Sequence, residues 1–485
     1  MKNCNKLRLL LLYLLPTALF LSYHPHIKVT TLPFMYIELS ITLIWLALFS
    51  LLSIPFLPES LKFLMRHFSV KIRPFFLLVF SLTTIFITFS VMTSPSRLRG
   101  LLTLIVLVCL IISILTIPKL ISSQKIKTKI IKLIILNGVF FAAICFLQCL
   151  LDLFGINRDI TLLCQGCTYR TFGFPHPNGF AVEPQFMGNL LLAPALLSLL
   201  LISNQKLRQN FFSRQDNFSK SLPILTIFLI ITLFLTFSRG AIYAFLLAVF
   251  TLIILSIAKK HHQLLQSNLK IIISVTLLSF VVSLLFQGIF SALSPTNDTF
   301  QSGITKSIHQ LSLGKIDLRN TPQHPAKTKA PSKPSSNLAP SHDGYIAEST
   351  NIRLKLSECG LDLWDDSPKN LLFGVGLGGA GQALYRKNPN FPGTPKEIIQ
   401  NEFVSILVEL GLLGAILILL CLSLIFYLFA KFSHLYIFIF ILVYAATLGF
   451  FSGLPNALHI YLMPALLFGV FAGSSKSPKS LCGKN

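Results

Sequence analysis

Charged side chains are scarce in this sequence, and acidic ones are the scarcest. Only 12% of its 485 residues are Asp, Glu, Lys or Arg, whereas soluble domains carry about 25%. Hydrophobic residues make up 53% of the chain, and the mean hydropathy is +0.72. Too few polar side chains remain to cover a water-soluble globule, and most of the chain is too apolar to be disordered. The composition excludes both classes and predicts an integral membrane protein.

The shortage of acid leaves 17 Asp and Glu against 41 Lys and Arg, a formal net charge of +24. Such an excess can indicate nucleic acid binding. In membrane proteins, however, Lys and Arg gather in the short cytoplasmic loops. More than half of the basic residues here fall in loops on one side of the apolar segments. We therefore expect the excess to set the membrane topology, with both termini in the cytoplasm and no nucleic acid partner.

Apolar segments long enough to cross a bilayer follow one another along the chain, since a transmembrane helix needs about 20 apolar residues. We expect an all-α integral membrane protein with about twelve transmembrane helices. The first segment has no small-residue cleavage pattern before His24, which favours a retained anchor over a removed signal peptide. The expected helices cover residues 8–22, 34–57, 74–93, 100–118, 133–153, 186–202, 222–237, 241–258, 271–290, 403–429, 434–453 and 456–473.

Two loops expected on the outer side are long enough to hold a functional site. In the large one, residues 294–349 are rich in Pro, Ser, Thr and Lys, which favours a flexible insertion. Residues 350–402 are expected to be structured and to begin with a short amphipathic helix at the membrane interface. The expected organisation is 1–153 with helices one to five, 154–185 as the first outer loop, 186–290 with helices six to nine, 291–402 as the large extracytoplasmic loop, 403–473 with helices ten to twelve, and 474–485 as a cytoplasmic tail.

Three patterns could suggest a metal or a nucleotide, but each has a plainer explanation. The C-x-x-C motif from Cys164 to Cys167 favours a local disulfide, because a zinc site needs two further ligands. The G-x-G-x-x-G motif from Gly376 to Gly381 has no βαβ unit around it, as dinucleotide binding requires. Three aspartates near a helix end, Asp362, Asp365 and Asp366, are best explained as solvated. We expect neither a metal nor a cofactor.

Two arginines on the expected outer side are candidates for binding an anion. Arg239 lies in Thr-Phe-Ser-Arg-Gly between two apolar runs, where an arginine costs roughly 2.5–3.5 kcal/mol on insertion scales. Arg353 lies on the expected amphipathic helix. A guanidinium grips phosphate through two parallel hydrogen bonds and keeps its charge. The pair could clamp a diphosphate, although Arg239 could also stabilise a turn and Arg353 could simply face solvent.

Several polar residues near the expected outer ends of helices could act in catalysis. His176 lies between two prolines, and Glu183 directly precedes an apolar helix, where an isolated carboxylate is expensive. Either could be a general base, and either could serve only the local turn or helix start. Gln400, Asn401 and Glu402 enter the helix expected at 403–429, where they could also be helix caps.

Four segments together resemble the superfamily of O-antigen ligases and O-antigen polymerases, which are polytopic glycosyltransferases of bacterial membranes. The resemblance covers about residues 133–430. The matching segments are Phe174-Pro-His-Pro-Asn178, Thr236-Phe-Ser-Arg-Gly-Ala241, Arg353 with Asn370-Leu-Leu-Phe-Gly-Val-Gly-Leu-Gly378, and Asn401 with the span that follows it to Gly411.

The resemblance implies a multi-pass protein of the cytoplasmic membrane that uses an oligosaccharide on undecaprenyl diphosphate as donor. A glycan, lipid or protein would be the acceptor, and its hydroxyl would attack the anomeric carbon. Arg239 and Arg353 would stabilise the departing diphosphate without a metal. Four residues, Asn178, Gly374, Gly376 and Gly378, would shape the loops of the site.

One position departs from the family pattern. Family ligases carry a catalytic histidine where this chain has Gln400, and glutamine cannot take a proton. The general base would then be Glu183, Glu402 or His176, or the step would depend on stabilisation of the leaving group instead. The departure weakens the ligase interpretation more than the polymerase one. A ligase acting on lipid or protein, and a transporter of lipid-linked sugars, remain alternatives.

Overall fold

The structure is a computed structural model of the chain. It describes residues 2–32, 35–65, 72–154, 170–171, 174–175, 177–181, 183–213, 215–258, 262–293, 299–312, 316, 342–388, 398–431, 435–449 and 457–471.

Helices account for most of the described residues. Eight of them are long and apolar enough to cross a membrane, and three shorter helices are also apolar. This is the fold of an all-α membrane protein, while the total of twelve spans stays a prediction. The elements are α1 (Lys2–Phe20), β1 (His26–Leu32), β2 (Met35–Ser40), α2 (Ile41–Ser53), the 3-10 helix η1 (Ile54–Phe56), α3 (Leu57–Met65), α4 (Ile72–Thr93), α5 (Arg97–Leu120), α6 (Gln124–Leu153), β3 (Arg170–Thr171), β4 (Phe174–Pro175), α7 (Pro184–Ser203), α8 (Gln205–Phe211), α9 (Asn217–Leu235), α10 (Arg239–Ala258), α11 (His262–Leu293), α12 (Phe300–Leu311), α13 (His342–Trp364), α14 (Pro368–Phe373), α15 (Ala380–Lys387), α16 (Glu402–Lys431), α17 (Leu435–Leu448) and α18 (Leu458–Phe471).

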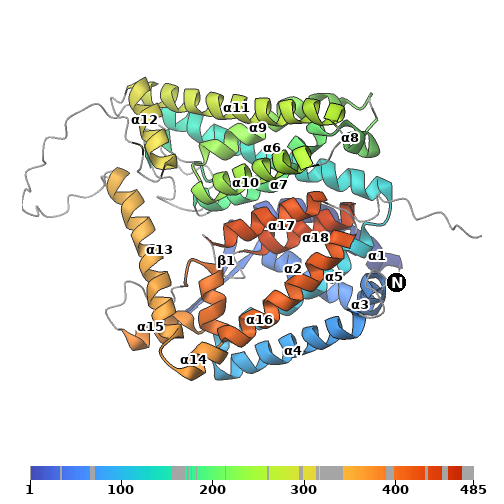
Figure 1. Ribbon diagram of the computed structural model, residues 1–485, viewed down its shortest axis with the longest axis vertical. Helices are drawn as coiled ribbons and strands as arrows, with labels where there is room; N and C mark the ends of the chain where they lie inside the picture. Colours follow the sequence, from blue (N-terminus) through green and yellow to red (C-terminus); the bar gives the residue numbers. More distant parts are fainter. Residues whose placement is uncertain are drawn as a thin grey trace, which may run out of the picture.

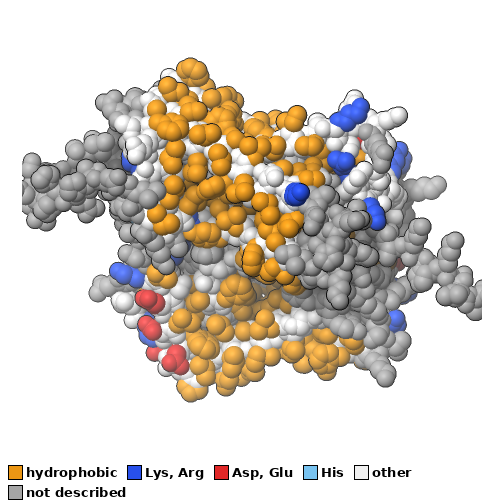
Figure 2. Space-filling view, turned by 45° about the horizontal axis from the view of Figure 1, so that its top comes forward, with side chains coloured by type: hydrophobic (Ala, Val, Ile, Leu, Met, Phe, Trp, Pro, Cys, Tyr) orange, Lys and Arg blue, Asp and Glu red, His pale blue; other side chains and the backbone are white. Residues whose placement is uncertain are grey.

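The long helices run roughly side by side and leave two distinct ends (Figure 1). One end carries α13, α14, α15 and β1, and we call it the α13 end. The other carries α3, α8 and the N-terminus, and we call it the α8 end. On the face drawn in Figure 2, hydrophobic side chains form a broad belt between the ends, and Lys and Arg gather toward the α8 end. An apolar belt between polar ends fits a bundle that crosses a bilayer.

Helix α7 lies at the centre of the bundle. Of its most apolar stretch, 94% is buried inside the protein, compared with 28% for α4. Small residues let the neighbouring helices approach closely. A Cβ at Gly188 of α7 would lie 2.5 Å from Ser238 Cβ, and one at Gly138 of α6 would lie 2.5 Å from Pro194 Cβ. Close contacts therefore fix α7 against α6 and against Ser238.

The structure corrects the start of the helix expected at 34–57. Residues Met35–Ser40 form β2 and pair antiparallel with His26–Leu32. Helix α2 begins only at Ile41, where the Ser40 side chain accepts the Leu43 N–H at 3.3 Å. A serine at this position ends an extended segment and starts a helix by satisfying a free N–H. The apolar run alone could not show that boundary.

The expectation of a flexible insertion at 294–349 is also wrong in part. Phe300–Leu311 forms α12, which packs along α11, with Gly303 against Ser291 and Gly288 against Phe300. Its apolar residues recur at the helical period and share one face, a signal that the average composition of the long segment hides. In addition, α13 begins at His342, before the boundary expected at residue 350.

Candidate active site

Three predicted site residues, far apart in sequence, meet at the α13 end. The Arg353 Nε of α13 donates a hydrogen bond to Gln400 Oε1 at 2.8 Å. Its Nη2 lies 4.0 Å from Glu183 Oε2 at the start of α7. The side chains of Arg353 and Glu183 are 25% and 39% exposed. One guanidinium thus bridges a carboxylate and an amide at a solvent-accessible position.

Local sequence explains why these side chains face one another. Glu183 is the N-cap residue of α7, directly before Pro184, yet its side chain makes no capping bond. Its carboxylate is therefore directed to the site instead of the helix. Asn401 does cap its helix, because its Oδ1 accepts the N–H groups of Phe403 and Val404 at 3.1 and 3.2 Å. This cap leaves the preceding residue, Gln400, just before the first turn of α16.

Arg239 is held close to the same helix end. It is the first residue of α10, and Ser238 before it caps that helix by accepting the Ala241 N–H at 3.3 Å. The Ser238 Oγ also donates to the Gln185 carbonyl at 3.3 Å. The Ser-Arg-Gly turn therefore docks on the first turn of α7, two residues from Glu183. Arg239 itself is half-buried.

The Asn178 loop is held by hydrogen bonds from a residue of α6 that the sequence did not single out. Gln148 of α6 donates through Nε2 to Asn178 Oδ1 at 3.0 Å, and its Oε1 accepts the N–H groups of Asn178 and Gly179 at 3.2 and 2.9 Å. Asn178 Nδ2 closes the loop onto the Ala181 carbonyl at 2.9 Å. Asn178 thus shapes the loop. A glutamine inside an apolar helix was the available signal for Gln148.

The glycine-rich segment from Gly374 to Gly378 docks against α16 and α4. Gly374, Gly376 and Gly378 have φ of 73°, 103° and 70°, a region that side chains disfavour. A Cβ on Gly376 would lie 2.4 Å from backbone Cα of Ser94. The glycines allow this close backbone packing, and their loop-shaping role in a functional site stays a prediction.

An aromatic layer that no sequence pattern indicated lies close to Glu183. Tyr23, after α1, stacks on Phe186 with ring centroids 4.6 Å apart. Its ring also meets His459 of α18 edge to face at 6.5 Å. Burial, and then the nearby charge of Glu183, raise the pKa of Tyr23 well above its ordinary value. Tyr23 therefore stays a neutral phenol beside the carboxylate.

The remaining predicted residues contribute less to this geometry. Glu402 begins α16 and is half-buried. Asp366 pairs with Lys387 at 2.8 Å. His176 and the segment from Cys164 to Cys167 lie outside the described residues. Within the described residues, no group of three His, Cys, Asp or Glu side chains is placed to hold a metal ion.

Comparison with known proteins supports the resemblance. Residues 224–419 match the model of the O-antigen ligase family. No curated protein matches the chain. The matched stretch contains Arg239, Arg353 and Gln400, and so most of the residues that meet at the α13 end. This multi-pass protein therefore carries, at residues 224–419, a domain that matches the O-antigen ligase family and supports the resemblance to the O-antigen ligase superfamily.

Proposed function

We propose that this protein transfers and polymerises oligosaccharide units carried on undecaprenyl diphosphate. The match of residues 224–419 to the O-antigen ligase family supports glycosyl transfer within a membrane. The observation that supports this reaction is the bridge from Arg353 to Gln400 and Glu183. The guanidinium of Arg353 is a permanent cation that can stabilise a departing diphosphate. The carboxylate of Glu183 beside it can act as a general base.

In the proposed reaction, an acceptor hydroxyl attacks the anomeric carbon of the donor sugar. The bond from that carbon to the diphosphate oxygen breaks, and its electron pair leaves with the diphosphate. Arg353, assisted by Arg239, stabilises the developing negative charge. Glu183 accepts the hydroxyl proton. The 4.0 Å separation of Arg353 and Glu183 exceeds that of a tight ion pair, so the donor phosphate can displace the carboxylate and leave it free to act as base.

Gln400 has a different role in this proposal. Its Oε1 already accepts the Arg353 Nε, and an amide cannot take up the proton of the acceptor. Gln400 therefore orients the guanidinium of Arg353. A site without a histidine at this position supports polymerisation over ligation to a lipid or protein, as the sequence suggested. Cells lacking the gene would lose long chains while single units are still attached. Loss of all attachment would indicate a ligase.

The topology is part of the proposal. The α13 end would face the outer side of a bacterial cytoplasmic membrane, and both termini would face the cytoplasm. The gathering of Lys and Arg toward the α8 end in Figure 2 supports this orientation through the positive-inside rule. Cysteine labelling from either side of sealed vesicles would test it, with one cysteine placed at Lys387 and one at Lys206.

Reconstitution with a lipid diphosphate-linked oligosaccharide would test the reaction. Arg353→Ala and Arg239→Ala should each lower transfer by about 100-fold, as removal of one charge-stabilising donor does in other enzymes. Arg386→Ala is the matched control, because Arg386 is exposed on α15 at the same end. Full transfer by both site variants would refute the clamp, and donor movement without a new glycosidic bond would indicate a transporter.

A further inference from the structure

Helix α16 is broken where it meets the glycine-rich segment. Gly411 has φ 65° and ψ −173° inside the helix, and a Cβ there would lie 2.5 Å from Leu372 backbone carbon. The break takes carbonyls before it out of the helical ladder, and in a membrane these need other partners. The N–H groups of Val375 and Gly376 supply them, bonding the carbonyls of Val408 and Glu409 at 2.9 and 3.0 Å.

The side chain of Glu409 adds a charged bond to this joint. Its Oε2 accepts the Gly378 N–H at 2.8 Å, and its Oε1 faces the Ala380 N–H at 3.5 Å. A carboxylate deep in an apolar helix is expensive unless it is bonded in this way. The Glu409 side chain thus bonds directly to the backbone of the glycine-rich segment.

The joint connects directly to the helix that carries Arg353. Ala380 and Leu384 of α15 belong to a small buried cluster with Leu356 of α13. Leu356 lies three residues after Arg353, close to one helical turn. Figure 1 shows α13, α14 and α15 gathered beside α16 at this end.

Residues next to Gln400 share the same cluster. Ile399 and Val408 belong to it, and a Cβ on Gly360 of α13 would lie 2.8 Å from Ile399 Cδ1. Both members of the bond from Arg353 to Gln400 are thus anchored in the cluster that Glu409 helps to assemble.

We propose that Glu409 is a positioning residue, which holds Arg353 against Gln400 by fastening the glycine-rich segment into the break of α16. The expected effect of Glu409 on transfer rests on the proposed function. Its structural role does not, because that role concerns only the packing of the glycine-rich segment against α16 and the position of α13.

A double-mutant cycle tests the catalytic part. Glu409→Gln keeps the side-chain volume, loses the charge and should lower transfer about tenfold, a coupling typical of residues in one network. In the Arg353→Lys background the same substitution should have almost no further effect. Equal losses in both backgrounds would overturn the proposal, because they would show a general structural defect. Glu358→Gln, an exposed change on α13, is the matched control and should leave transfer unchanged.

Hydrogen exchange tests the structural part without any activity. Glu409→Gln should speed amide exchange in residues 374–380 and also in the turn of α13 around Arg353. Faster exchange confined to residues 374–380 would overturn the positioning role. If wild-type protein transfers no glycan, the proposed function fails. The exchange rates around Arg353 still show whether Glu409 holds that turn of α13 in place.

A milder variant guards against misfolding. Leu377 N–H donates to Ser90 Oγ of α4 at 2.9 Å, so Ser90→Ala loosens the same segment without touching the carboxylate. It should lower transfer about fivefold, since an ordinary hydrogen bond contributes about 1 kcal/mol. It should show the same loss of effect beside Arg353→Lys, and an undiminished effect there would count against the proposal.

Discussion

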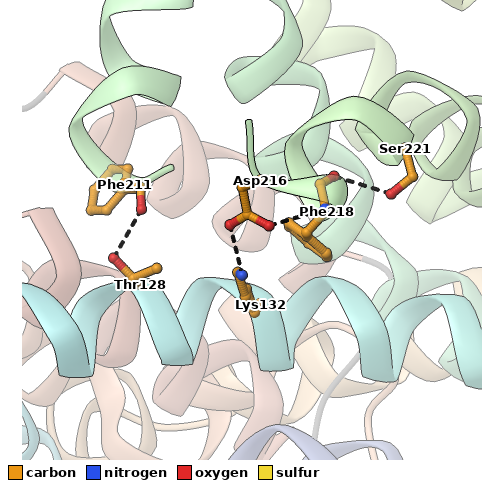
Figure 3. A network of polar contacts seen from close by, with 6 residues as sticks. All are labelled: Thr128, Lys132, Phe211, Asp216, Phe218 and Ser221. Atoms are coloured by element: carbon orange, nitrogen blue, oxygen red, sulfur yellow. Dashed lines mark hydrogen bonds and ion pairs between the residues drawn. The ribbon is translucent and has the colours of Figure 1, made fainter. Parts of the chain in front are cut away.

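Two ion pairs at opposite ends of the bundle differ in their separation and in whether the carboxylate also caps a helix. At the α8 end, Lys132 Nζ lies 2.8 Å from Asp216 Oδ2, while Asp216 Oδ1 caps α9 by accepting the Phe218 N–H at 3.1 Å (Figure 3). At the α13 end, Arg353 and Glu183 stand 4.0 Å apart, and Glu183 makes no capping bond. We call the first pair closed, because its atoms are in hydrogen-bond contact and its carboxylate also caps a helix. We call the second pair open, because its atoms are farther apart and its carboxylate caps nothing.

The difference indicates which pair serves the fold and which serves a ligand. A short pair that also caps a helix has its charges satisfied within the protein. A long pair keeps hydrogen-bonding capacity for something else. In the network of Figure 3, the hydroxyls of Thr128 and Ser221 also bond carbonyls of Phe211 and Phe218. The α8 end therefore behaves as a structural joint, whereas the α13 end keeps its charges available for a ligand.

The largest expected effect comes from Arg353→Lys. Lysine keeps the charge but cannot present the planar fork that reaches Gln400 and a phosphate together. Transfer should fall by about 100-fold, comparable to the loss of one charge-stabilising donor, with little change in the unfolding temperature. Initial rates with the lipid-linked donor would check this. Rates close to wild type would mean that a point charge is enough, and the open pair would lose its special role.

Gln400→Met should have the next largest effect. It nearly preserves volume but removes the acceptor of the Arg353 Nε. Transfer should fall at least about tenfold, because a hydrogen bond to a charged group contributes about 1.5–3 kcal/mol. The fall should appear in kcat more than in KM if Arg353 acts mainly on the leaving group. A KM effect alone would assign Gln400 to donor binding.

The contrast between the ends also shows how far the sequence could lead. Apolar length located most of the long helices, because a span leaves a strong and continuous signal. It missed β2 and α12, where a capping serine and a short helical period decided the structure. Short, locally determined elements leave too little signal in an average over many residues.

For the site, the sequence supplied residue types but not their distances. Glu183, Arg353 and Gln400 were all named as candidates, yet their meeting depends on packing among α7, α13 and α16. Asn401 was expected either as a catalytic residue or as a cap, and the structure shows a capping side chain. Gln148 and Tyr23 were missed because each lies in or beside an apolar segment. Gln148 reaches the site through the Asn178 loop, and Tyr23 reaches it by stacking on Phe186 of α7.

Asp216→Asn should affect stability and leave transfer intact. It removes the charge that meets Lys132 and weakens the cap of α9. The side chains of Lys132 and Asp216 are 34% and 25% exposed, so solvent screening limits the cost to about 1 kcal/mol. Chemical unfolding in detergent, run beside transfer rates, would check this. Lost transfer at unchanged stability would show that the α8 end also takes part in function.

The pH dependence of the same pair gives the smallest expected effect. The hydrogen bond from Lys132 holds the pKa of Asp216 below its ordinary value, which is about 3.9. A carboxyl with a lowered folded-state pKa adds stability that is complete above the ordinary value and is lost as the pH falls through the folded value. The stability difference between wild type and Asp216→Asn should therefore be constant from pH 7 to about 5 and shrink below about pH 4. Unfolding measured across this range would check the sign, and a difference that grows on acidification would show that the closed pair is not the source of its stability.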